Sequence, residues 1–286
     1  MSGPLVLGTR GSPLALRQAE MVADAMAGEV ELVVLRTGGD RGGGTDKRRW
    51  VDTIEDALLA GQIDLAVHSA KDLPGVLADG LEIAGCPLRA DPRDALCGAA
   101  SLGALARGAR VGTSSLRRAA QLRALREDLS VVELHGNLDT RLGRLAAGDY
   151  DAIVLARAGL ARLGRDGGAL LEELVPAAGQ GTLAIEARTR DARVASAVAG
   201  LRDGATERAL SAERTLVSRL GAGCDTPIGA HAAAGGDGAA LELRAFVGAA
   251  DGAHWIRDTL AGSDPVELGE AVAERLLAAG AGALLA

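Results

Sequence analysis

The chain has 286 residues, of which 48% are hydrophobic, and a formal net charge of −7. This length and apolar content allow a sizeable core divided over two or three domains, and they exclude a disordered chain. The acidic balance argues against nonspecific binding to nucleic acid, which requires a broad basic face, so no nucleic-acid partner is expected.

The N-terminus shows no basic segment followed by an apolar one, and no stretch of about 18 uncharged apolar residues occurs. We therefore expect a soluble, cytoplasmic protein without a membrane partner. Cys86, Cys97 and Cys224 are an odd number without a CxxC spacing, and the four histidines are scattered. These patterns fit neither a disulfide framework nor a metal site, so reduced thiols and no structural metal are expected.

Short β-rich runs alternate with helical patterns in the first ninety residues. Strands are predicted at 4–8, 31–36, 63–69 and 81–86, and helices from about Ser12 and around 51–60. Such alternation is typical of βαβ units on a mainly parallel sheet. Ser12 followed by Pro13 predicts a helix N-cap, which places Arg10 just before a helix N-terminus, a favourable position for an anion.

A charged stretch at 89–96 then separates this unit from a second α/β series, with strands in ARVGTSS, SVVELHGN and DAIVLARAGL. The apolar run that ends the segment 175–188 is expected to return to the first sheet, which would leave a cleft between two domains. From about residue 206, a helix, a glycine-rich loop, a strand and a C-terminal helix indicate a small α+β domain. The predicted domains are 1–88 with 182–202, 92–178, and 206–286.

Several arginines follow predicted strands of the two α/β domains. GTSSLRR at 112–118 places hydroxyl residues at a strand-to-helix turn beside two arginines, and HGNLDTRL at 135–142 repeats this arrangement. Ligands of open α/β folds bind at the carboxyl edge of the sheet. A helix cap followed by solvated arginines remains the alternative for GTSSLRR alone. If the arginines converge, the expected ligand carries several carboxylates; they are Arg10, Arg117, Arg118, Arg141 and Arg162.

Two further segments hold candidate catalytic residues. HSAKDLP at 68–74 follows a strand and places Lys71 and Asp72 on a tight loop, where a carboxylate near arginines stabilises a positively charged nitrogen or exchanges protons with it. A surface Lys/Asp pair is the alternative. Cys224 lies in a glycine loop, where an exposed thiol is a better nucleophile than the thiols of Cys86 and Cys97 in apolar runs. An inert cysteine remains possible there.

The order of these motifs resembles the porphobilinogen deaminase family. The match extends from about residue 9 to 231 and rests on TRGSPLAL, HSAKDLP, ADPRDAL, GTSSLRR, GN..TRL, YDAIVLA.AGL.RLG, PA.GQG and the C-terminal AER…GC…PIGA. The resemblance implies an α/β fold with two domains like type II periplasmic binding proteins around a central cleft, plus a small α+β C-terminal domain.

The resemblance also implies an activity, that of a hydroxymethylbilane synthase. This transferase of tetrapyrrole and haem biosynthesis deaminates and joins four porphobilinogen units head-to-tail on a covalent dipyrromethane cofactor, then releases hydroxymethylbilane by hydrolysis. Porphobilinogen carries acetate and propionate groups, which accounts for clustered arginines. A monomer is implied as well.

Residue roles are carried over from the family's motifs. Asp72 matches the catalytic aspartate, and Cys224 matches the cysteine that holds the cofactor by a thioether. Further cofactor-binding positions are matched by Ser69, Lys71, Thr113, Ser115, Arg117, Arg118 and Asn137. Substrate-binding positions are matched by Arg10, Ser12, Lys47, His135, Arg141 and Arg162.

Some residues depart from the family pattern. His135 stands where many members have arginine and is only partly charged near neutrality, Asp52 stands at a lysine position, and Asp225 follows the cysteine. The loop before residue 50 is also shortened. We expect altered cofactor loading or elongation rather than another reaction. The alternative is a noncatalytic paralogue that binds a carboxylate-rich or pyrrole ligand in the same cleft.

Overall fold

The computed structural model describes residues 3–35, 48–221, 226–235 and 240–285, with only the backbone described for residues 48–50. The chain forms two compact units. The first comprises Met1–Ala90 and Thr182–Arg208, and the second comprises Asp91–Gly181 and Ala209–Ala286. The chain thus leaves the first unit and later returns to it, as the apolar run at the end of 175–188 predicted.

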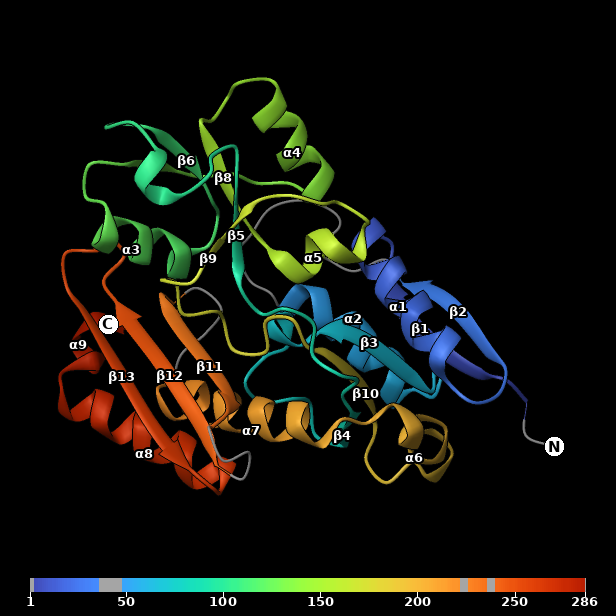
Figure 1. The fold of residues 1–286 in the computed structure, drawn as a ribbon. Helices are drawn as coiled ribbons and strands as arrows, with labels where there is room; N and C mark the ends of the chain where they lie inside the picture. Colours follow the sequence, from blue (N-terminus) through green and yellow to red (C-terminus); the bar gives the residue numbers. More distant parts are fainter. Residues whose placement is uncertain (1–2, 36–47, 222–225, 236–239, 286) are drawn as a thin grey trace. The chain divides into compact units, whose positions relative to one another are not determined.

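The first unit is built on a five-stranded sheet in the order β2-β1-β3-β10-β4 (Figure 1). Strand β1 runs parallel to β2 and β3, whereas β10 is antiparallel to both of its neighbours. Four of the five strands run in one direction, so the prediction of a mainly parallel sheet is confirmed; β10 runs against them because it enters on the chain's return and not through a βαβ crossover. The strands are β1 (Leu5–Arg10), β2 (Val30–Leu35), β3 (Leu65–Ser69), β4 (Leu81–Gly85) and β10 (Leu183–Arg188).

Helices cover both faces of this sheet, because successive residues of a strand point to opposite sides. Leu65 and Val67 of β3 pack in one core with α1 (Pro13–Ala25) and α6 (Ala192–Val198), while Ala66 packs in another with α2 (Arg48–Leu59). The Ser12 hydroxyl accepts a hydrogen bond from the backbone N–H of Ala15 and caps α1, as predicted. The described residues of this unit also form the 3-10 turns η2 (Ala70–Asp72) and η4 (Ala199–Leu201).

The second unit contains a sheet in the order β7-β6-β8-β5-β9, in which β6 is parallel to β7 and β8, and β5 is antiparallel to β8 and β9. The stretch 89–96 was expected only to separate two domains, but Asp94–Cys97 forms the buried strand β5. The other elements are β6 (Arg110–Gly112), β7 (Ser130–Val132), β8 (Ala152–Ala156), β9 (Ala169–Leu171), η3 (Leu102–Ala104), α3 (Leu116–Leu125), α4 (Leu138–Ala146) and α5 (Arg157–Arg162).

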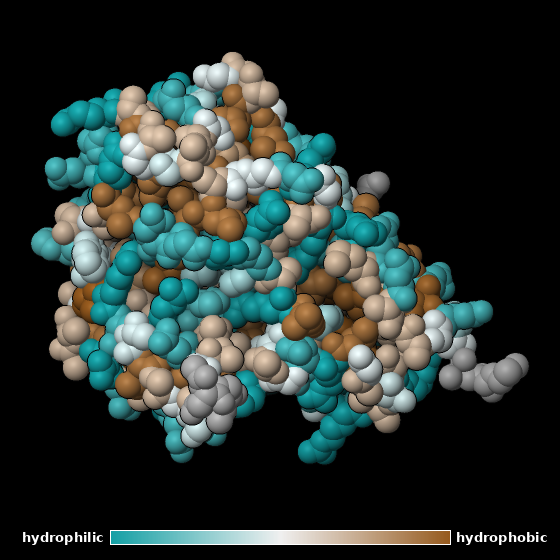
Figure 2. Space-filling model, in the orientation of Figure 1, coloured by the Kyte–Doolittle hydropathy of each residue, from teal (hydrophilic) through white to brown (hydrophobic). Residues whose placement is uncertain are grey.

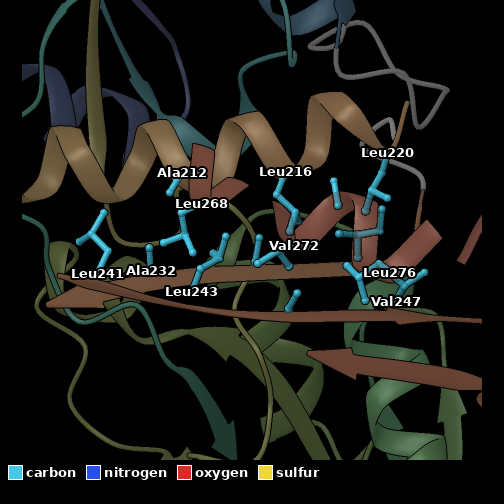
Figure 3. Close-up of a cluster of buried hydrophobic side chains, with 14 of the residues drawn as sticks. Ala212, Leu216, Leu220, Ala232, Leu241, Leu243, Val247, Leu268, Val272 and Leu276 are labelled. Carbon is cyan, nitrogen blue, oxygen red and sulfur yellow. The ribbon is translucent and has the colours of Figure 1, made fainter. Parts of the chain in front are cut away.

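The C-terminal part of the second unit is a three-stranded antiparallel sheet covered by helices. Its elements are α7 (Gly204–Arg219), β11 (Ile228–Ala234), β12 (Leu241–Gly248), β13 (Trp255–Gly262), α8 (Pro265–Ala278) and α9 (Ala281–Leu285). Figure 3 shows Leu216 of α7, Val272 of α8 and Leu243 of β12 in the aliphatic core between helices and sheet. Each such side chain contributes about 1.5–3 kcal/mol by its burial.

The predicted fold class, an α/β chain with a small α+β C-terminal part, is confirmed. The boundaries of three domains and the cleft between two of them stay predictions. Hydrophilic and hydrophobic residues are interspersed over the face drawn in Figure 2. Among the residues that the structure describes, no helix combines the length and apolar character needed to cross a membrane.

Candidate active site

The candidate residues of the first unit lie at one edge of its sheet. Strands β1 and β3 are parallel neighbours, so their carboxyl ends meet at the same edge. Arg10 is the last residue of β1 and Ser69 is the last residue of β3. Lys71 and Asp72 follow directly in the turn η2. The sequence prediction that Asp72 lies on a tight turn after a strand is thus confirmed.

The turn that carries Asp72 is anchored by its backbone and by Ser69. The amide N–H of Ala70 donates to the carbonyl of Thr182 at 3.0 Å, and that of Leu73 donates to Ala70 at 3.2 Å. The Ser69 hydroxyl lies 2.9 Å from Nε2 of Gln18 on α1. Lys71 and Asp72 themselves are half-buried. The carboxylate therefore stands on a fixed backbone and retains access to solvent.

In the second unit, the strand order β7-β6-β8 brings three strand ends together in the same way. Arg141, near the start of α4, connects two of the segments that follow these strands. Its Nη2 donates to the Ser114 hydroxyl at 3.2 Å, and its Nε donates to the Gly136 carbonyl at 2.8 Å. The motifs GTSSLRR and HGNLDTRL therefore lie side by side, as their positions after parallel strands predicted.

Polar candidates in these segments cap helices. The Ser115 hydroxyl accepts from the N–H of Arg118 at the start of α3, and Asn137 Oδ1 accepts from the N–H of Thr140 at 2.8 Å at the start of α4. Thr113 is buried, and its hydroxyl accepts from the N–H of Ser115 at 3.1 Å. These residues hold the helix N-termini at the edge where the arginines gather.

Arg117 and Arg118 are buried around a single carboxylate. Arg117 Nη1 lies 2.8 Å from Asp94 Oδ2, and Arg118 Nη2 lies 2.8 Å from Asp94 Oδ1. Burial alone would raise the pKa of Asp94, but the two positive charges outweigh it and hold this pKa well below its usual range. Two guanidinium groups face one carboxylate, so this core retains a surplus positive charge. The alternative of solvated arginines does not apply, since both side chains are buried.

Asp94 belongs to the motif ADPRDAL, but its role was not predicted from the sequence. The available signal was a carboxylate at the first position of a short apolar run, which needs a cationic partner if that run is buried. Gln180 of the GQG motif also donates to Asp94 Oδ1, at 2.9 Å. Asp94 thus connects the motifs ADPRDAL and PA.GQG.

Arg162 is a half-buried cation at the end of α5. Its Nη2 donates to the carbonyl of Gly181 at 2.6 Å, and among the residues that the structure describes it forms no ion pair with a carboxylate. Burial lowers the pKa of Arg162 to about 10. A desolvated guanidinium without a counter-ion is costly, and an anionic ligand would relieve that cost.

His135 is exposed and lies beside an acidic residue. Its Nε2 is 3.1 Å from Glu133 Oε2, and the two side chains are 67% and 81% exposed. The Glu133 carboxylate therefore competes with an anionic ligand for contact with this imidazole. Asp52 is exposed on α2.

Three residues discussed from the sequence, Lys47, Cys224 and Asp225, lie outside the described residues. Cys86 and Cys97 are buried thiols, as expected. Within the described ranges, no three His, Cys, Asp or Glu side chains are grouped so that they could hold a metal ion.

Comparisons with known proteins agree with this arrangement of motifs. Residues 5–196 match the family model "Porphobilinogen deaminase, dipyromethane cofactor binding domain", and residues 208–278 match "Porphobilinogen deaminase, C-terminal domain". The chain is 50% identical to a porphobilinogen deaminase of Roseiflexus sp. (strain RS-1), with full coverage of both chains. It is 46% identical to that of Rubrobacter xylanophilus, covering 100% of this chain and 97% of the relative.

Solved structures give weaker similarities. A periplasmic substrate-binding protein of an ABC transporter from Coxiella burnetii is 18% identical with a TM-score of 0.44, covering 71% of this chain and 94% of its own. Immunogenic lipoprotein A from Vibrio vulnificus is 17% identical with a TM-score of 0.43, covering 71% and 96%.

Proposed function

This chain belongs to the porphobilinogen deaminase family, and from that premise we propose which of its residues carry out the family's reaction. The chain is a hydroxymethylbilane synthase, a transferase that joins four porphobilinogen units on a dipyrromethane cofactor and releases the linear product. The alternative of a noncatalytic paralogue finds no support among the comparisons.

The observation that carries the proposal is the half-buried guanidinium of Arg162. It is partly desolvated and forms no ion pair with a described carboxylate, while Arg141 lies in the neighbouring segment that follows β7. Porphobilinogen brings two carboxylates with each unit, so it supplies the counter-ions that such cations need. We assign substrate carboxylates to Arg10, Ser12, Lys47, His135, Arg141 and Arg162.

Asp72 is assigned the catalytic role. Its carboxylate is an acceptor on a fixed turn, half-buried and next to Lys71. In that position it stabilises the positive charge that develops on a pyrrole nitrogen as ammonia leaves, and it exchanges a proton with that nitrogen.

The dipyrromethane, when bound, supplies the end of the chain to which pyrrole units are added. Its carboxylates suit the surplus positive charge around Asp94 and the capped helix N-termini of α3 and α4. We assign its binding to Ser69, Lys71, Thr113, Ser115, Arg117, Arg118 and Asn137, and its thioether to Cys224. We also propose that the protein acts in the cytoplasm as a monomer without a nucleic-acid partner, in keeping with its net charge of −7.

The experiment is an intact-mass measurement of the purified protein before and after incubation with porphobilinogen. We expect a covalent adduct that grows with substrate, is absent from Cys224→Ser, and persists in Cys97→Ala, which removes a buried thiol instead. An unmodified wild-type chain that stays unmodified with porphobilinogen would contradict the assignment. An adduct retained by Cys224→Ser would contradict the attachment site.

A further inference from the structure

The first unit contains a buried pair of titratable side chains that the proposed reaction does not use. His68 Nε2 lies 3.0 Å from Glu186 Oε2. The His68 side chain is 5% exposed and the Glu186 side chain is 0% exposed. Neither residue takes part in the carboxylate-binding sets described above.

The pair joins two neighbouring strands directly below the catalytic turn. In the antiparallel pairing of β3 with β10, His68 stands opposite Ala184 and Glu186 stands opposite Ala66. His68 and Glu186 therefore project from the same face of the sheet, the face on which Ala66 packs against α2. Ser69, the next residue, points to the other face and bonds Gln18 of α1.

Glu186 is fully buried and depends on its contact with His68. Among the described side chains, His68 is the only one that forms an ion pair with Glu186, whose carboxylate has no access to solvent. A carboxylate in such a place is strongly disfavoured without its partner, so the imidazole is held where the carboxylate requires it. Glu55 of α2 is a nearby carboxylate that interacts electrostatically with both Glu186 and His68. Burial and then the charge of Glu186 raise the pKa of Glu55.

We propose that His68 and Glu186 are positioning residues for Asp72. The pair fixes the end of β3 from the α2 side, and the contact between Ser69 and Gln18 fixes it from the α1 side. Two consecutive residues are thereby held from opposite faces just before η2, which carries Asp72. Displacements of about 1 Å are enough to lower catalytic rates substantially. This inference rests on the proposed role of Asp72.

The test replaces the pair with apolar side chains of similar size, because such replacements of buried ion pairs usually preserve or raise stability. For the double variant Glu186→Leu/His68→Leu we expect a melting temperature no lower than that of the wild type, kcat reduced about tenfold or more, and KM within about twofold. Glu186→Gln should keep most of kcat, because the side chain keeps its length and an oxygen atom that can face His68. Glu55→Gln is the matched control. It removes a buried carboxylate of α2 that accepts from the backbone N–H of Ala78 and forms no bond to β3, so kcat should stay unchanged.

A folded double variant with wild-type kcat would overturn the proposal, as would an equal loss of kcat in Glu55→Gln. Should the double variant fail to fold, Glu186→Asp shortens the reach of the carboxylate by one methylene. Glu186→Asp is expected to have a lower kcat than Glu186→Gln. If both variants have the kcat of the wild type, the proposal is overturned. Wild-type turnover in the same assay keeps the two ideas separate, because failure of the proposed function abolishes product in every protein.

Discussion

The carboxylate of Asp94 and the guanidinium of Arg117 form a 2.8 Å ion pair that is almost closed to solvent within the second unit. Arg118 shares the same carboxylate from the next position of α3. One acidic residue of β5 thus organises both arginines of the GTSSLRR motif. The arrangement fixes the start of α3 and leaves positive charge for an anion.

Asp94→Asn should be strongly destabilising, by about 3–5 kcal/mol in the free energy of unfolding, because it leaves two buried guanidinium groups without a counter-charge. Denaturant unfolding measures this loss. Asp149→Asn is the matched control, since it breaks the exposed pair with Arg144 and should cost less than about 1 kcal/mol. Similar losses in the two variants would contradict the structural role of Asp94.

Arg162→Met should weaken substrate binding without lowering the stability of the protein. Loss of a charge-assisted contact to a substrate carboxylate is expected to raise KM for porphobilinogen about tenfold or more. The melting temperature should change little, because the substitution removes a desolvated charge together with one hydrogen bond to Gly181. Steady-state kinetics and thermal melts provide the two readouts. Arg162→Lys should have a KM between those of the wild type and Arg162→Met, because lysine keeps the charge but lacks the planar guanidinium. An unchanged KM in Arg162→Met would refute the assignment.

Asp72→Asn should lower kcat by about 10²- to 10⁴-fold, because the amide preserves the shape of the side chain but cannot stabilise a cation or accept its proton. KM should change much less. Asp79→Asn removes an exposed carboxylate after the same turn and serves as the control. Turnover of Asp72→Asn within about twofold of the wild type would exclude Asp72 as the catalytic carboxylate.

His135→Arg should improve substrate binding. A permanent charge would replace an imidazole that faces Glu133, and guanidinium groups bind carboxylates in a bidentate manner. We expect KM to fall about threefold to tenfold with kcat nearly constant. Glu133→Gln should act in the same direction, because it removes the competing carboxylate. A rise in KM in both variants would contradict a substrate-binding role at this position.

Glu55→Gln should alter the pH dependence of stability. The pKa of Glu55 is raised in the folded protein, so the folded state holds this proton more tightly than the unfolded state. The wild type therefore loses stability as the pH rises from 4.5, the ordinary value, through the raised pKa. The variant lacks this loss and should be the more stable protein at pH 7. The difference should disappear below pH 4.5, and unfolding curves across this range would detect it.

Local features were predictable from the sequence because their causes are local. Ser12 before Pro13 marks a helix start, and an apolar run followed by KDLP marks β3 and its turn. The ion pair of Asp94 with Arg117 and the pair of His68 with Glu186 join segments far apart in the chain. Hydrophobic periodicity carries no information on such pairs, nor on the direction of β5, whose charged first residue resembled a linker.

The position of β10 restricts the order in which the first unit can fold. Its residues lie between β3 and β4 in the sheet, but they are synthesised only after all of Asp91–Gly181. During translation, β3 therefore has an unpaired edge at a stage when all five strands of the Asp91–Gly181 sheet have already been synthesised. The turn that carries Asp72 lacks the Thr182 carbonyl that anchors it until Thr182–Arg208 has been synthesised, so this turn is completed late.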